Sequence, residues 1–62
     1  MPALQIEGSR ADLVAKLREM AVGWSHLGKP QRAEASQAGA ERLEAGESTI
    51  KVGPTEYVVT HE

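Results

Sequence analysis

The alternation of hydrophobic and polar residues at the start of the chain predicts a short strand. Within residues 3–7 (ALQIE), Leu4 and Ile6 share one face and polar side chains occupy the other. A period of two residues is typical of a half-buried β-strand. Gly8 follows directly and is expected to end this strand.

The period then changes to that of an α-helix. Ser9 and Asp12 have the spacing of a capping box, which predicts that a helix begins at Arg10. Gly28 is expected to end this helix, because glycine suits the position that follows a helix C-terminus. Large apolar residues recur every three or four positions and share one helix face: Leu13, Leu17, Met20, Trp24 and Leu27.

A second helix is predicted from Pro30 up to Gly46. Proline is favourable in the first turn, and the residues that follow have high helix propensity. The short connection makes the two helices antiparallel neighbours. Gly39, inside this helix, is expected to permit close packing between the helices. The best apolar face consists of small residues and one leucine: Ala33, Ser36, Ala40 and Leu43.

The last segment predicts a β-hairpin. Pro54 suits the second position of a turn over residues 53–56, between two runs of high β-propensity. Alternation then predicts the pairs Val52 with Tyr57, Ile50 with Val59, Lys51 with Val58, and Thr49 with Thr60.

These elements predict one small α+β domain over residues 1–62, in the order β-α-α-β-β. We expect a three-stranded antiparallel sheet with the helical hairpin packed on one face. The other face would carry Ala3, Gln5, Thr49, Lys51, Val58 and Thr60. The predicted core consists of Leu4, Ile6, Leu13, Leu17, Met20, Trp24, Leu27, Leu43, Ile50, Val52, Tyr57 and Val59.

Composition indicates how so small a domain could be supported. Of the 62 residues, 40% are hydrophobic, but nine are alanine, and there is no cysteine and only two histidines. The lack of cysteine excludes disulfides, and two histidines are too few ligands for the usual structural zinc site. We therefore expect self-association, with no metal or cofactor. The sequence shows no signal peptide and no apolar segment long enough to cross a membrane, so we expect a cytoplasmic protein. Its composition, with little lysine, no asparagine and many Ala, Gly and Glu residues, suggests a bacterial source.

The sequence offers no set of residues suited to catalysis. Ser25 and His26 are adjacent on a helix and point about 100° apart, so they cannot form a dyad. The carboxylates Glu41, Glu44 and Glu47 lie on one helix surface and are expected to be solvated. The glycines are scattered and form no phosphate-binding loop. We therefore predict a protein that is not an enzyme.

The distribution of charge favours protein binding. The net charge is −2, but residues 1–32 carry five basic and three acidic residues, whereas residues 33–62 carry two basic and six acidic residues. We expect a regulatory or protein-binding module that acts as a homodimer, with its basic half guiding association. The candidate partner-binding residues are Arg10, Lys16, Arg18, Lys29, Arg32 and Val58.

The alternative is a dimeric DNA-binding regulator. A helix pair followed by a hairpin resembles the plan of a winged helix-turn-helix, in which the second helix enters the major groove. Acidic residues on the second helix and directly after it, together with the lack of a third helix, disfavour this alternative. These residues are Glu34, Glu41, Glu44 and Glu47. Its candidate DNA-binding residues are Lys29, Gln31, Arg32, Ser36, Gln37 and Lys51.

Overall fold

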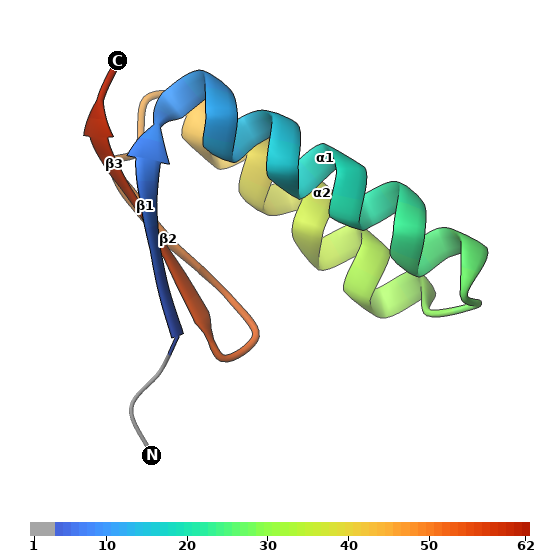
Figure 1. The fold of residues 1–62 in the computed structure, drawn as a ribbon. Helices are drawn as coiled ribbons and strands as arrows, with labels where there is room; N and C mark the ends of the chain where they lie inside the picture. The colour runs from blue at the N-terminus through green and yellow to red at the C-terminus, as the bar shows by residue number, and fades with distance from the viewer. Residues whose placement is uncertain (1–3) are drawn as a thin grey trace.

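A computed structural model describes residues 4–62, which form a three-stranded sheet with two helices on one face (Figure 1). The elements are strand β1 (Leu4–Ser9), helix α1 (Arg10–His26), helix α2 (Pro30–Glu44), strand β2 (Thr49–Val52) and strand β3 (Thr55–His61). The α+β class, the β-α-α-β-β order and the position of the helical hairpin are confirmed. Ala3, the first residue of the predicted strand, lies outside the described residues.

Local signals in the sequence set the limits of α1 as predicted. The Ser9 hydroxyl accepts a hydrogen bond from the backbone N–H of Asp12 at 3.2 Å, which caps the helix N-terminus. Gly28 follows the helix with a φ of +74°. The N–H of Lys29 then donates to the carbonyl oxygen of Trp24 at 2.9 Å, which satisfies a free carbonyl group of the last turn.

The sheet is mixed, so the prediction of an antiparallel sheet is wrong for one of its two pairings. The strand order is β1-β3-β2, with β2 antiparallel to β3 as expected for a hairpin. β1 runs parallel to β3, and its register pairs Ile6 with Tyr57. Gly8 does not end β1 either, since pairing continues to Ser9 with an irregularity between the two residues.

The spacing of the two helices explains why β1 pairs with β3. β1 leads directly into α1, and α2 packs on β2. Packed helices lie about 8–10 Å apart, whereas neighbouring strands lie only about 4.8 Å apart. The strands below the two helices are therefore two strand positions apart. β3 fills the position between them, where its direction is parallel to that of β1.

The hairpin register differs from the predicted one by two residues. The observed pairs are Val52 with Thr55 and Ile50 with Tyr57, so only residues 53 and 54 form the loop. Gly53 has a φ of +61°, and a positive φ followed by proline is typical of a type II′ turn. Because the shift is an even number, every side chain stays on its predicted face.

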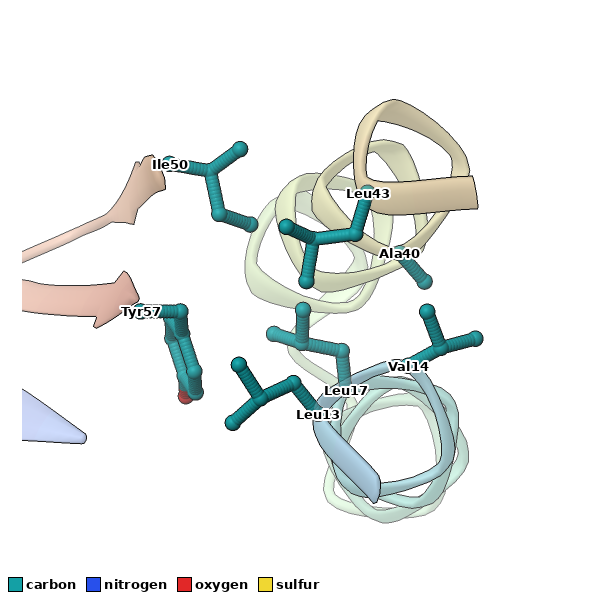
Figure 2. Packing of buried hydrophobic residues seen from close by; sticks show 7 residues of the cluster. All are labelled: Leu13, Val14, Leu17, Ala40, Leu43, Ile50 and Tyr57. Carbon is teal, nitrogen blue, oxygen red and sulfur yellow. The ribbon is translucent and has the colours of Figure 1, made fainter. Parts of the chain in front are cut away.

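The core lies between the sheet and the two helices. Its buried hydrophobic residues are Leu13, Val14, Leu17, Ala40, Leu43, Ile50 and Tyr57 (Figure 2). Val14 and Ala40 lie between the helices and were not in the predicted core. Ile6, Met20, Val52 and Val59 are partly buried against it, as predicted. The prediction is wrong for Leu4 and Leu27, which are 63% and 69% exposed because they lie at the ends of their elements.

Candidate functional site

The two helices extend past the sheet and form a concave notch with the hairpin turn. In Figure 1, α1 and α2 diverge from the strands toward the loop that joins them. A pocket of about 440 Å³ lies between this end of the helix pair and the turn, and we refer to it as the notch. Its main lining residues are Met20, Trp24, Arg32 and Ala35 from the helices, and Val52 and Pro54 from the hairpin.

Helical periodicity explains why the notch has an apolar wall. Met20 and Trp24 continue the stripe that begins with Leu13 and Leu17, so they face the same side of α1. The hairpin ends at residues 53 and 54 and leaves this part of the stripe without a strand to cover it. Trp24 was predicted to be a core residue, but it is half-buried and lines the notch.

Arg32 is held against the indole ring of Trp24. Its guanidinium carbon lies 4.8 Å from the ring centroid, which is within the range of a cation–π interaction. Within residues 4–62, the Arg32 side chain forms no ion pair and no hydrogen bond. Its N–H groups are therefore free to bind an acceptor at the edge of the notch.

Ser36 contributes a buried hydroxyl to the wall of the notch. The residue is 0% exposed, and its Oγ atom has no hydrogen-bond partner within residues 4–62. Buried polar atoms are usually paired, because leaving one unpaired costs about 1–3 kcal/mol. The Ser36 hydroxyl is therefore a polar group without a hydrogen-bond partner within residues 4–62, next to an apolar surface.

The Tyr57 side chain connects the notch to the core. Its phenol donates a hydrogen bond to the sulfur of Met20 at 3.2 Å, and Met20 lines the notch. Burial raises the pKa of the Tyr57 phenol above its ordinary value of 10.0, because the charged form is poorly solvated there. The phenol therefore stays protonated around neutral pH and fixes one wall of the notch.

Three arginines at the opposite end of the molecule form ion pairs within the chain. Arg10 binds Glu62, Arg18 binds Glu44, and Arg42 binds Glu47. Hydrogen bonds from Arg10 and Arg42 lower the pKa of the Glu62 and Glu47 carboxyl groups, respectively. These arginines therefore neutralise nearby carboxylates and leave little free positive charge at that end.

The structure distributes the predicted partner-binding residues over several surfaces. Arg10 and Arg18 are engaged in the ion pairs just described, and Lys16 is exposed on α1. Val58 is half-buried on the sheet face that the helices leave uncovered. Lys29 and Arg32 belong to the start of α2, and of the six only Arg32 lines the notch.

The candidate DNA-binding residues also differ in their accessibility. Gln31 and Arg32 are exposed in the first turn of α2, whereas the buried Ser36 cannot reach a base edge without a rearrangement. Gln37 donates a hydrogen bond to Glu41 at 3.3 Å. The remaining two are exposed lysines in separate elements, Lys29 and Lys51.

Sequence reasoning missed the hairpin side of the notch. Val52 was assigned to the core and Pro54 to a turn, while Ala35 was given no role. One signal in the sequence could have identified the site. The apolar stripe of α1 spans fifteen positions, Leu13 to Leu27, and the strands offer too few apolar side chains to cover all of it.

Comparison of the chain with protein-family models, curated proteins and solved structures gives no match. Residues 4–62 contain no group of three His, Asp or Glu side chains placed to hold a metal ion. No helix in the described part of the chain has the length and apolarity needed to cross a membrane.

Proposed function

We propose that the chain is a small protein-binding module without enzymatic activity, that it acts as a homodimer, and that the notch receives a segment of another protein. The observation that supports this proposal is the combination of Trp24, Met20 and Arg32 around one uncovered concavity. Tryptophan, methionine and arginine are enriched at protein interfaces, and tryptophan and arginine account for much of the binding energy there.

The shape and chemistry of the notch favour a protein segment over a small substrate. Trp24, Met20, Val52 and Pro54 give it a mainly apolar surface, and it is open on one side. A large apolar side chain of a partner would extend the core past the hairpin turn and cover Trp24. Each fully buried side chain of this kind contributes about 1.5–3 kcal/mol.

The proposed dimer uses the free edge of β1. The small core of seven buried hydrophobic residues in the described chain favours association, because a domain of this size is only marginally stable alone. β1 has six residues, and its outer edge has no neighbouring strand among residues 4–62. Leu4, on the helix-facing side of β1, is 63% exposed and would be covered by a second copy.

The other edge is less suited to pairing. β2 has only four residues and carries the exposed Lys51 at its centre. Short edge strands and lysine side chains are features that protect a sheet edge against association. Two β1 strands that pair about a two-fold axis would form a continuous six-stranded sheet and leave both notches open.

The docking proposal can be tested by blocking the notch. Peptides selected from a displayed random library for binding to the chain should lose affinity when Ala35→Arg fills the notch. Ala38→Arg is the matched control, because Ala38 is exposed on α2 and does not line the notch. Both changes keep helix propensity high. Equal binding to the two variants would contradict docking in the notch.

DNA binding is tested separately by an electrophoretic mobility shift with mixed-sequence duplexes at low and high salt. We expect no shift of the DNA, since α2 presents Glu34 and Glu41 on its exposed surface. A shift that weakens steeply with salt would favour the DNA-binding alternative and overturn the protein-binding proposal.

A further inference from the structure

We propose that the segment bound in the notch is acidic, with a large apolar side chain against Trp24 and an Asp or Glu carboxylate on Arg32. This inference rests on the proposed function, because it specifies the chemistry of the partner that docks in the notch. Three features of the described residues support it: the orientation of Arg32, the distribution of paired charges, and the unpaired hydroxyl of Ser36.

Arg32 is positioned before any partner arrives. The contact with the Trp24 ring, 4.8 Å from guanidinium carbon to ring centroid, restricts the side chain to the edge of the notch. A guanidinium group carries five N–H donors in a planar arrangement that matches a carboxylate with two parallel hydrogen bonds. Because the side chain is already held in place, binding a carboxylate there costs less conformational entropy.

Arg32, at the notch, is the one arginine that forms no ion pair within residues 4–62. Arg10, Arg18 and Arg42 are each paired with a glutamate of the chain itself. Lys29 and Arg32, at the start of α2, form no ion pair within residues 4–62. The notch end therefore carries free positive charge that attracts an acidic segment.

The same charges disfavour a second copy of the chain as the occupant of the notch. A two-fold contact between two notches would bring Arg32 and Lys29 of each copy close to those of its mate. Like charges at an interface are destabilising when no carboxylate lies between them. The dimer proposed above uses the β1 edge and avoids this repulsion.

The Ser36 hydroxyl offers a second polar contact. Its Oγ is unpaired at the wall of the notch, four residues after Arg32 and on the same side of α2. Because Ser36 is 0% exposed, the side chains that cover it must move aside before an oxygen of the bound segment can accept its hydrogen. Such a contact would remove an unpaired buried group and add to the affinity for an oxygen-bearing occupant.

The fluorescence of Trp24 provides a direct test, because it is the only tryptophan of the chain and lies in the notch. The probes are short synthetic peptides with one central Phe or Leu flanked by Glu, with Gln and Lys versions as matched controls. We expect the Glu peptide to shift the emission of Trp24 and to bind about tenfold more tightly than the Gln peptide at low salt. Screening by high salt should remove most of this preference.

The variants measure the preference for Glu over Gln and not the affinity alone. Arg32→Gln removes the cation–π contact as well as the charge, so a change in overall affinity would not separate the two effects. The ratio of the two affinities should fall close to one in Arg32→Gln. It should keep its original value in Lys16→Gln, which removes the same charge from an exposed position on α1.

The outcomes distinguish this inference from the function on which it rests. Equal binding of the Glu and Gln peptides, or tighter binding of the Lys peptide, would contradict the inference that the partner is acidic. Either result would still agree with docking in the notch. No response of Trp24 to any peptide, together with equal behaviour of Ala35→Arg and Ala38→Arg, would overturn the proposed function itself.

Discussion

Arg10 and Glu62 form a two-point ion pair that joins the start of α1 to the last residue of the chain. The two hydrogen bonds measure 2.7 Å from Nε and 2.9 Å from Nη2. The same guanidinium donates to the carbonyl oxygens of Leu43 at 2.5 Å and Glu47 at 2.8 Å. One side chain thus links the start of α1 to Glu62 and adds a hydrogen bond to a carbonyl group at the C-terminal end of α2.

This arrangement predicts that part of the stability is lost in acid. Hydrogen bonds from arginine lower the pKa of the Glu62 and Glu47 carboxyl groups from their ordinary value of 4.5. A carboxyl group whose pKa is lower in the folded state stabilises the protein above its unfolded pKa, and this contribution is lost as the pH falls through the folded pKa. The melting temperature should therefore fall between about pH 5 and pH 3.

The control for the acid effect is the double variant Glu62→Gln and Glu47→Gln. Its melting temperature, followed by circular dichroism, should be lower than that of the original chain at neutral pH and should change less between the two pH values. The same pH dependence in both proteins would show that these two carboxylates make no contribution.

Replacement by alanine should change the stability of the fold in opposite directions at Gly39 and Gly23. A Cβ atom at Gly39 would lie 2.8 Å from Cδ1 of Ile50 and 2.9 Å from Cγ2 of Val52, whereas at Gly23 it would meet nothing within 4 Å. Gly39→Ala should therefore destabilise the fold by about 1–3 kcal/mol through overpacking. Gly23→Ala should stabilise it by about 0.5–1 kcal/mol, since alanine favours the helix.

Urea unfolding of both glycine variants measures these free energies. If Gly39→Ala is as stable as Gly23→Ala, α2 does not approach β2 as closely as described. The sequence predicted close packing between the helices, but the closest atoms to Gly39 belong to β2. The same pair of variants therefore tests whether close packing on β2 is the reason for a glycine inside α2.

Tyr57 should contribute to stability through its volume and through its neutral phenol. The side chain is 1% exposed, so Tyr57→Ala should cost about 3–5 kcal/mol. Burial raises the pKa of the phenol, so ionisation favours the unfolded state once the pH passes the unfolded pKa of about 10. Tyr57→Phe should keep most of the stability at neutral pH and lose less of it than the original chain above about pH 10.

Thermal melts from about pH 8 to pH 11 distinguish these two contributions. An unchanged melting temperature for Tyr57→Ala would mean that Tyr57 is not a core residue. Identical alkaline behaviour of Tyr57→Phe and the original chain would mean that the phenol is solvated in the folded state.

The proposed dimer predicts a melting temperature that rises with protein concentration, because association stabilises only the folded state. Leu4→Glu should abolish this dependence and give a monomer in sedimentation experiments. Val22→Glu is the matched control, because Val22 on α1 is 59% exposed and Leu4 is 63% exposed. A monomer at high micromolar concentration, or equal effects of the two variants, would contradict pairing through β1.

The sequence alone determined the elements and the faces of this protein. Short-range signals such as Ser9, Gly28 and Pro30 act within one turn of a helix, so they set its limits wherever the helix packs. Alternation in Ile50, Val52 and Tyr57 likewise fixed which side of each strand faces the core. The predicted faces are correct even though the predicted hairpin register is wrong by two residues, because side chains on a strand alternate with a period of two.

Tertiary structure alone decided the order of the strands and the location of the notch. Whether β1 lies beside β2 or β3 depends on the distance between two packed helices, which no local pattern in the sequence encodes. Trp24 has the same periodicity as Leu17, yet Leu17 is buried and Trp24 lines an open surface. The difference arises because the hairpin turns at Gly53 before it reaches Trp24, so burial there depends on how far a distant segment extends.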